Sequence, residues 1–490
     1  MKLNPRYLQL DSALYHLQRP TPLGTKAIAG HFNEALATQL NWTDDEKNDW
    51  LLYCSGHQYF ASPSLAMAYA GHQFGHWAGQ LGDGRGLLMA QVIDIHGETI
   101  DLHLKGAGQT PYSRMGDGRA VLRSTIREYL GAHALTALGI PSSNALGFST
   151  SDTHIRRERL ERGAMLLRTC DSHIRLGHFE WLARFYPQYL PTFVQHCIAW
   201  HYPECLNSDE PILAWVRAVI AKTASLIAQW QLTGFVHGVM NTDNLSITGT
   251  TIDFGPFVFM ERHRPSYAFN HSDSEGRYVY ENQPKIAKWN LWVWVSSLLS
   301  LAPTLNHSLD TKRFSYKLLE ALDEFDTLFD TYFYHGLAKK MGLPFETLTP
   351  TDKQAVIKCT QSFLKILKEE QLDFTNSFRH LTDKNLDALR NECLDGRQFD
   401  EFTHQYHHLR QFADIQALTK TMQQVNPIYI LRTQMAQTAI DHANDLDFSE
   451  VARLFTLLTH PFTKQPSLEK PSDITPLDKK HTGISLSCSS

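Results

Sequence analysis

The sequence predicts an α+β protein in which a strand-rich N-terminal part precedes a larger, mainly helical C-terminal part. Three observations support this prediction. Residues 87–105 form two apolar stretches around a His-Gly-Glu turn, a pattern typical of paired strands. Apolar residues recur at helical spacing over 211–234 and in several segments from about 311 to 459. A loop that begins with His and ends with Asn, residues 237–244, stands between the two parts and is followed by Asp-Phe-Gly at 253–255.

The strands of the N-terminal part are predicted from the alternation of apolar and polar residues. In the second strand of the 87–105 pair, apolar residues at 100, 102 and 104 alternate with Asp101, His103 and Lys105. Because successive side chains of a strand point to opposite faces, the apolar set is expected to pack on a core and Lys105 to lie on the opposite, polar face. A helix is predicted over 118–140, with Glu128 near its middle, and further strands over 140–150 and 163–170.

The C-terminal part is predicted to be helical from about residue 173. The long helix over 211–233 is closed by Gly234 and leads directly into the 237–244 loop. The last residues are polar and carry several prolines and lysines, and are expected to be flexible. The domain organisation we predict is 1–172 (N-terminal extension and N-lobe), 173–310 (C-lobe core), 311–462 (additional C-terminal helices) and 463–490 (tail).

Composition narrows the class of protein. The chain has 490 residues, and its 46 basic against 51 acidic residues give a net charge of −5, so a nucleic-acid partner is not expected. We expect no apolar run to reach the ~20 residues of a membrane span, and the first residues lack a signal-peptide core, so a cytoplasmic protein without a membrane partner is expected. The seven cysteines show no CxxC pairing and are predicted to be mostly buried thiols. The oligomeric state stays open.

Four residues occur in the chain order that a kinase-type nucleotide site needs. Lys105 could reach phosphate from its strand, and Glu128 on the following helix could pair with it. Asn244 and Asp253 are hard-oxygen donors suited to Mg²⁺ and are separated by a short predicted hairpin. Together with the two-part organisation, this order predicts a protein-kinase-like bilobal fold. Each residue alone would more often be surface charge or a chance match.

The loop departs from a kinase loop at one position. Kinase loops carry an Asp two residues after the His, where this chain has Val239. Asp243 stands beside Asn244 instead. The absence of the usual Asp argues against transfer of the γ-phosphoryl group, and the complete set of metal-ligand candidates argues against a non-catalytic scaffold that only binds nucleotide.

Glycines and arginines surround these residues. The sequence Gly-Asp-Gly-Arg occurs at 82–85 and again at 116–119, as tight turns or as amide donors to phosphate. Arg85, Arg119, Arg168 and Arg175 are either surface residues or cations around a nucleotide bound with its triphosphate reoriented. A zinc site built from Cys54, His57, His72 and His76 is disfavoured, because glycines interrupt the helix that the last two would need.

Longer motifs carry a resemblance to a known family. "GQLGDGRG" at 79–86, the stretch 104–130, "HGVMNTDN", "DFGPF" and "NHSDSEGRY" together resemble the selenoprotein O family, over nearly the whole chain from about residue 20. The resemblance implies a pseudokinase-fold protein adenylyltransferase (AMPylase) that binds ATP flipped relative to kinases. It would transfer AMP to Ser, Thr or Tyr hydroxyls of protein substrates in a Mg²⁺-dependent reaction, with Mn²⁺ as a possible substitute.

The resemblance also assigns residues. It implies nucleotide binding by Gly82, Gly84, Arg85, Lys105, Asp117, Gly118, Arg168, Arg175 and Asp253. It implies that Glu128 pairs with the lysine, that Asn244 and Asp253 bind the metal, and that Asp243 accepts the hydroxyl proton. Asn244 beside it was expected, as a metal ligand, to lower the pKa of Asp243. The family's C-terminal Cys or selenocysteine corresponds to Cys488, whereas the Cys that some members place before "NHSD" is Phe269 here, so an internal disulfide is not expected.

Overall fold

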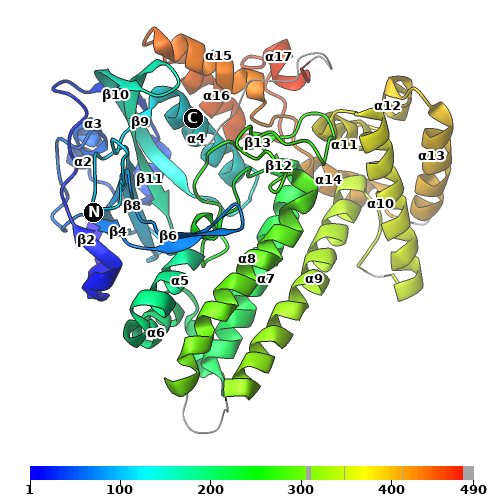
Figure 1. Cartoon of the computed structure of the whole chain (residues 1–490). Helices are drawn as coiled ribbons and strands as arrows, with labels where there is room; N and C mark the ends of the chain where they lie inside the picture. The colour runs from blue at the N-terminus through cyan, green and yellow to red at the C-terminus, as the bar shows by residue number, and fades with distance from the viewer. Residues whose placement is uncertain (305–310, 347, 412, 478–490) are drawn as a thin grey trace.

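The structure is a computed structural model that describes residues 1–304, 311–346, 348–411 and 413–477. All but two short strands lie before residue 171, and nearly all the long helices lie after it (Figure 1). The mixed α and β content that we predicted, with a large antiparallel sheet followed by many helices, is therefore confirmed.

A nine-stranded antiparallel sheet organises the N-terminal part. Its order is β2-β4-β7-β8-β11-β10-β3, with β1 paired to β7 and β9 paired to β11. The strands are β1 (Lys2–Leu3), β2 (Tyr15–Leu17), β3 (Ile28–Phe32), β4 (Leu65–Met67), β7 (Gly86–Ile93), β8 (Thr99–Lys105), β9 (Ala120–Val121), β10 (Asn144–Arg156) and β11 (Leu160–Cys170). The hairpin predicted over 87–105 is β7–β8, and the strands predicted over 140–150 and 163–170 are β10 and β11.

Strand β8 lies inside the sheet between β7 and β11. Leu102 and Leu104 are completely buried in an apolar cluster on one face, as their alternation predicted. The opposite face is polar but equally buried, since Asp101, His103 and Lys105 are each at most 3% exposed. Buried polar groups need partners, so this face has to form a hydrogen-bonded network rather than a solvated surface.

A second, two-stranded sheet stands apart from the large one. It consists of β5 (Ala70–Gln73) and β6 (His76–Gln80), joined by a turn in which Phe74 and Gly75 have φ of 52° and 84°. Three short helices follow β3, namely α1 (Glu34–Gln39), α2 (Asp44–Asn48) and α3 (Trp50–Cys54).

Helix α4 (Leu122–Ala137) packs on β10 and β11 and carries Glu128. The C-terminal helices α15 (Thr433–Asn444) and α16 (Ser449–Thr459) cover its other side, at the top of Figure 1. Phe455 of α16 stacks on Tyr129 and His133 of α4, with ring centroids 5.4 and 3.7 Å apart. The end of the chain thus completes the core of its beginning, which the sequence pattern did not predict.

The remaining helices form the lower and right-hand parts of Figure 1. They are α5 (Leu176–Phe185), α6 (Leu190–His201), α7 (Pro211–Thr233), α8 (Gln283–Ser297), α9 (Thr311–Met341), α10 (Pro350–Glu370), α11 (Phe374–Thr382), α12 (Leu386–Glu392), α13 (Gly396–Arg410) and α14 (Ile415–Val425). Helix α7 ends at Gly234, which has the left-handed φ of 71° that favours glycine at this position.

Helix α7 contradicts the expectation that no apolar stretch is long enough to span a membrane. Its 23 residues have a mean hydropathy of 1.5 over an 18-residue window, so by length and composition it could cross a membrane. In the structure it packs against α8 and α9, and Trp215, Val219 and Trp230 are completely buried. This burial accounts for its apolar composition as that of a core helix.

The polar C-terminal segment is ordered further than predicted. Residues 463–477 include helix α17 (Pro471–Ile474), and Asp473 is 1% exposed. Its carboxylate accepts hydrogen bonds from Arg453 at 2.8 and 3.1 Å. These buried ion pairs attach the segment to α16 because an unpaired carboxylate would be costly there. Cys488 lies outside the described residues.

Candidate active site

One cleft of about 750 Å³ lies between the sheet, the β5–β6 hairpin and the 237–244 loop. Its volume is suited to a ligand the size of a nucleotide. Eleven of the twelve predicted site residues line it, namely Gly82, Gly84, Arg85, Lys105, Asp117, Gly118, Arg168, Arg175, Asp243, Asn244 and Asp253. Glu128 lies directly behind it. Segments distant in sequence are therefore brought together, while the role of each residue stays a prediction.

The two Gly-Asp-Gly-Arg turns meet at this cleft. Gly82 has a φ of 136°, and a Cβ there would lie 2.5 Å from the Tyr112 ring. Gly118 has a φ of 70°, and its Cβ would lie 2.1 Å from the backbone of Gly108. Each position therefore requires glycine for both conformation and space. This close packing holds the two turns in fixed positions at the edge of the cleft.

A buried ionic cluster links the sheet to helix α4. The Glu128 carboxylate accepts hydrogen bonds from Lys105 on one oxygen and from Arg168 on the other. All three side chains are at most 8% exposed. Burial raises the pKa of Glu128, but the two cations outweigh that effect and hold the pKa below its usual value. The predicted pairing of Lys105 with Glu128 is present, and Arg168 joins it.

Asp253 is the next member of the cluster. Arg168 contacts its Oδ1 at 3.1 Å, and Arg175 donates to its Oδ2. The residue has a φ of 59°, which is uncommon outside glycine and turns its side chain toward the cleft. The carboxylate is thus held between two guanidinium groups, one from β11 and one from the start of α5.

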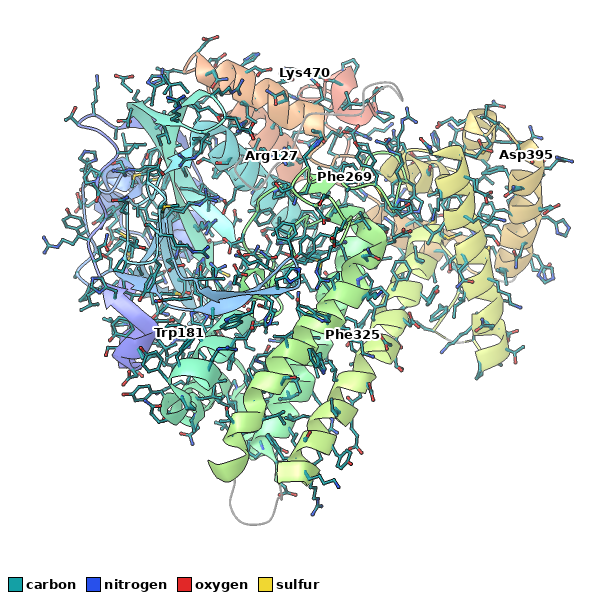
Figure 2. The ribbon with its side chains drawn as sticks, viewed as in Figure 1. Arg127, Trp181, Phe269, Phe325, Asp395 and Lys470 are labelled. Carbon is teal, nitrogen blue, oxygen red and sulfur yellow. The ribbon has the colours of Figure 1, made fainter. Side chains whose placement is uncertain are left out.

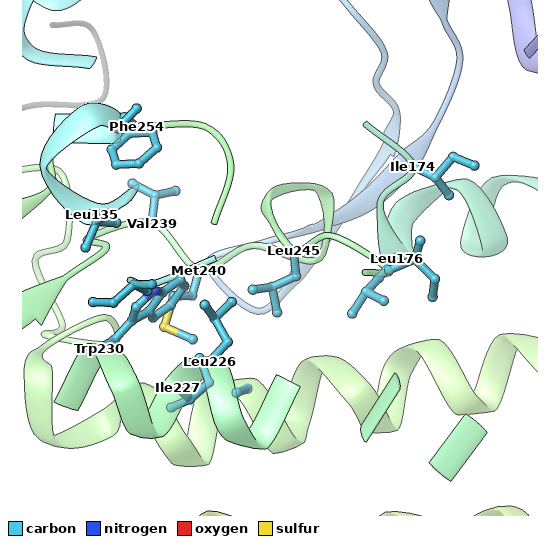
Figure 3. Close-up of a cluster of buried hydrophobic side chains, with 14 of the residues drawn as sticks. Leu135, Ile174, Leu176, Leu226, Ile227, Trp230, Val239, Met240, Leu245 and Phe254 are labelled. Atoms are coloured by element: carbon cyan, nitrogen blue, oxygen red, sulfur yellow. The ribbon is translucent and has the colours of Figure 1, made fainter. Parts of the chain in front are cut away.

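The 237–244 loop is fixed in place by its apolar residues. Val239, Met240 and Leu245 pack into the hydrophobic cluster in Figure 3, next to α7. The polar residues of the loop lie toward the cleft, and both Asn241 and Asp243 line it. Because Val239 and Met240 of the loop and Leu245 just after it are buried in the core, the loop is held in place while Asn241 and Asp243 line the cleft.

Asp243 has one bound oxygen and one free oxygen. Gln73 donates from Nε2 to its Oδ2 at 3.1 Å, whereas Oδ1 is buried and has no hydrogen-bond partner among the described residues. Burial raises the pKa of Asp243 to about 6, against the opposing effects of Gln73 and Arg175. The lowering of this pKa that we predicted depends on a metal ion bound at Asn244 and stays a prediction. A carboxylate with a pKa near neutrality is suited to accept a proton.

The oxygen donors of the cleft fit a hard cation. Asp253 offers a carboxylate, and Asn244, whose Nδ2 donates to the Val239 carbonyl at 3.0 Å, keeps its amide oxygen for a ligand. No group of three or more His, Cys, Asp or Glu suited to a metal occurs in the described part of the chain. Asp253 and Asn244 fit Mg²⁺ that takes most of its ligands from phosphates and water.

Three polar pairs at the cleft were not found from sequence. Arg157 at the end of β10 forms two hydrogen bonds with Asp117, at 2.7 and 2.8 Å. Asp83, inside the first glycine turn, pairs with His103 at 3.2 Å, and Gln73 binds Asp243. The position of Asp83 within a Gly-Asp-Gly-Arg motif could have indicated that it lies at the cleft. Its pairing with His103 could not be predicted from the spacing of residues along the chain.

The position preceding "NHSD" is occupied by an aromatic ring. Phe269, labelled in Figure 2, packs against Tyr267 with ring centroids 4.9 Å apart. It belongs to the edge of the hydrophobic cluster around α9, α10 and α11. A thiol at this position would lose that packing, so the phenylalanine has a structural function here. The six cysteines of the described residues are unpaired.

Comparisons with known proteins show the family of this chain. The family model "Protein adenylyltransferase SelO" matches residues 1–459. The chain is 41% identical to a protein nucleotidyltransferase YdiU of Vibrio parahaemolyticus, over 99% of this chain and 98% of that protein. It is 43% identical to one of Pseudomonas fluorescens and 40% identical to one of Pectobacterium atrosepticum, with the same coverage of both chains.

Proposed function

Because the chain belongs to the SelO family of protein adenylyltransferases, we propose that it transfers AMP from ATP to the hydroxyl of a serine, threonine or tyrosine in a protein substrate. It is a nucleotidyltransferase by this membership. The observation that supports the proposed chemistry most directly is the juxtaposition of a buried cation cluster with Asp243, which lines the same cleft.

The cation cluster suits attack at the α-phosphorus. In that reaction the bond between the α- and β-phosphates breaks, and negative charge develops on the departing pyrophosphate. Lys105, Arg168 and Arg175 would stabilise this charge, and the rigid glycine turns would add backbone amides. The side chain of Arg85 makes no hydrogen bond or ion pair with a described residue, and Arg85 lines the cleft, so its guanidinium group is available for phosphate. We propose that ATP binds flipped relative to kinases, with its triphosphate toward these cations.

The Asp243 carboxylate would take the proton of the attacking hydroxyl. A pKa of about 6 allows it to be ionised at neutral pH and still accept a proton during transfer. Asn244 and Asp253 would hold Mg²⁺, which would supply charge neutralisation of the phosphates when bound. Mn²⁺ satisfies the same donors, so either ion is compatible.

We extend the proposal to the organisation of the chain. The strand-rich residues 1–172 and the helical residues 173–310 would correspond to the two lobes of a kinase-like fold, with the cleft between them. Residues 311–462 would be additional helices, and 463–490 a C-terminal extension. A cytoplasmic location and the absence of nucleic-acid and membrane partners also remain proposals based on composition.

The test uses ATP labelled at either the α or the γ position, incubated with the protein, Mg²⁺ and a cell lysate. Transfer of the α label alone to protein is the expected result. Transfer of the γ label alone would show a kinase, and ATP binding with neither label transferred would show a non-catalytic scaffold. The Asp243→Ala variant should bind ATP but transfer at least about 100-fold more slowly, in line with the loss of a general base.

A further inference from the structure

The β5–β6 hairpin contacts the 237–244 loop through a set of hydrogen bonds. None of the hairpin residues that form them is among the predicted site residues. The His72 backbone N–H donates to Thr242 Oγ1 at 2.8 Å. The Phe74 N–H donates to Asn241 Oδ1 at 3.2 Å and to Tyr278 Oη at 2.8 Å. Gln73, between them, is the one hairpin residue whose side chain donates to the Asp243 carboxylate.

The contact is close enough to exclude side chains. A Cβ on Gly71 would lie 3.0 Å from Asp243 Oδ1 and 3.2 Å from Asp243 Cβ. A Cβ on Gly177 of α5 would lie 2.1 Å from the Ala70 carbonyl oxygen. The hairpin backbone is therefore seated directly on the loop on one side and on α5 on the other. In such a tight contact the backbone of Gln73 has a fixed position, from which its side chain reaches Asp243.

The neighbouring residue is anchored independently. His72 Nδ1 lies 2.6 Å from Oε2 of Glu180, which is 5% exposed, and the His72 ring packs edge-on against Trp289. Because the residues on both sides of Gln73 are held, by Glu180 and by Asn241 with Tyr278, the amide of Gln73 has a fixed location from which to donate.

The fixed position of Gln73 makes the two carboxylate oxygens of Asp243 different from each other. A carboxylate can rotate about its terminal bond, and this rotation exchanges its oxygens. The hydrogen bond from Gln73 distinguishes them, because it fixes Oδ2 and leaves Oδ1 without a partner among the residues described. Arg175 binds only the backbone carbonyl of Asp243, at 2.7 Å, and does not compete for Oδ1.

We infer that Gln73 is a positioning residue for AMP transfer: its hydrogen bond to Oδ2 holds the Asp243 carboxylate in one orientation at the cleft. The inference rests on the proposed role of Asp243. Gln73 itself does not take part in bond making or proton transfer. It acts through Asp243, so its removal should reduce the rate of transfer without weakening the binding of ATP.

The experiment compares Gln73→Ala with Gln80→Ala in the full-length protein. Gln80 is on the same hairpin, is exposed and makes no side-chain contact with the loop. Transfer of the α label is measured at varied ATP to separate kcat from KM, and melting temperature is measured alongside. We expect Gln73→Ala to lower kcat about 10- to 100-fold with KM for ATP within about threefold, as for a misplaced catalytic group. Gln80→Ala should match the unmodified protein.

Two further results decide the inference. A kcat for Gln73→Ala within twofold of that for Gln80→Ala would overturn it. So would a fall in kcat that comes with a large rise in KM and a lower melting temperature, because this pattern indicates a merely structural role. The Asp243→Ala variant is assayed in parallel. If it transfers AMP at the normal rate, the proposed role of Asp243 fails whatever Gln73 does, so the two failures are distinguishable.

Discussion

The most informative perturbation of the cluster is Glu128→Gln, which keeps the size of the side chain and removes its charge. Glu128 is the one carboxylate that binds both Lys105 and Arg168, and it is 2% exposed. After the substitution two buried cations face a neutral amide. They also repel each other, since the charge of Arg168 already lowers the pKa of Lys105.

The expected loss of stability follows from the burial of Glu128, Lys105 and Arg168. Removing one partner of a buried, hydrogen-bonded ion pair typically costs about 3–5 kcal/mol, because the remaining charge stays desolvated and unpaired. Here one anion serves two cations, so we expect the free energy of unfolding to fall by at least about 3 kcal/mol. The opposing effect of Glu128 on the pKa of Lys105 is also lost, so the lysine is less often charged. We therefore expect kcat/KM for AMP transfer to fall by about 100-fold or more, as for a lost charge-stabilising group.

The assay is urea denaturation together with α-label transfer, and the matched control is Glu324→Gln. Glu324 also binds an arginine, Arg217, at 2.9 Å, but both side chains are more than 40% exposed. An exposed pair contributes about 0–1 kcal/mol, so the control should unfold and react almost normally. A loss below about 1 kcal/mol for Glu128→Gln would refute the argument that the cluster is a buried, fully paired unit.

The dependence on pH gives a second check on Glu128. Because its pKa is lowered in the folded state, the stability that it contributes is present above the ordinary pKa of 4.5 and is lost as the pH falls below it. The part of the stability difference between the unmodified protein and Glu128→Gln that comes from the carboxylate charge should therefore narrow as the pH falls below 4.5. A difference that widened in acid would mean that the folded pKa is raised instead.

Three further predictions concern the metal site, the glycine turns and a buried histidine. Asp253→Asn should abolish metal-dependent AMP transfer, and a tenfold rise in Mg²⁺ should not restore it; unchanged activity would show that the metal assignment is wrong. Gly82→Ala should weaken ATP binding about tenfold or more, because its Cβ meets Tyr112. Gly97→Ala is the control, since it has a φ of 86° but nothing within 4 Å, and equal effects of the two would exclude crowding as the cause. Burial lowers the pKa of His133 to about 4, so the unfolded chain binds more protons than the folded chain between pH 6.5 and 4. The free energy of unfolding should therefore decrease as the pH is lowered through that interval. In His133→Asn this fall should be shallower, by up to about 1.4 kcal/mol per pH unit, and an identical slope would contradict the assignment.

Local pattern was sufficient for the elements that bear the site. The β7–β8 hairpin followed from alternation around a turn, and α4 and α7 from helical periodicity, so the approximate positions of Lys105 and Glu128 were predictable. Their pairing was predictable too, since a strand lysine and a charged residue on the next helix have few other ways to be buried. The participation of Arg168 was only a possibility, because it depends on β11 pairing next to β8.

Contacts that join distant segments could not be predicted in the same way. The β5–β6 hairpin contains glycines and alternates weakly, so neither its pairing nor its contact with the 237–244 loop has a periodic signal. The packing of α16 on α4 joins residues more than 300 positions apart. Residues 463–477 are polar in composition, and they are ordered because Arg453 pairs with Asp473, a specific interaction that average polarity does not report.

The replacement of the usual kinase Asp by Val239 has a structural reason. Val239 is 8% exposed and packs in the cluster of Figure 3, so its apolar side chain contributes to the core beneath the loop. Its backbone carbonyl accepts the hydrogen bond of Asn244, which depends on the backbone and not on the side chain. The apolar residue can therefore anchor the loop, while Asp243, bound by Gln73, is left for the proton transfer that we propose. Since anchor and acid occupy different positions, the loop remains suited to catalysis without the Asp that defines a kinase.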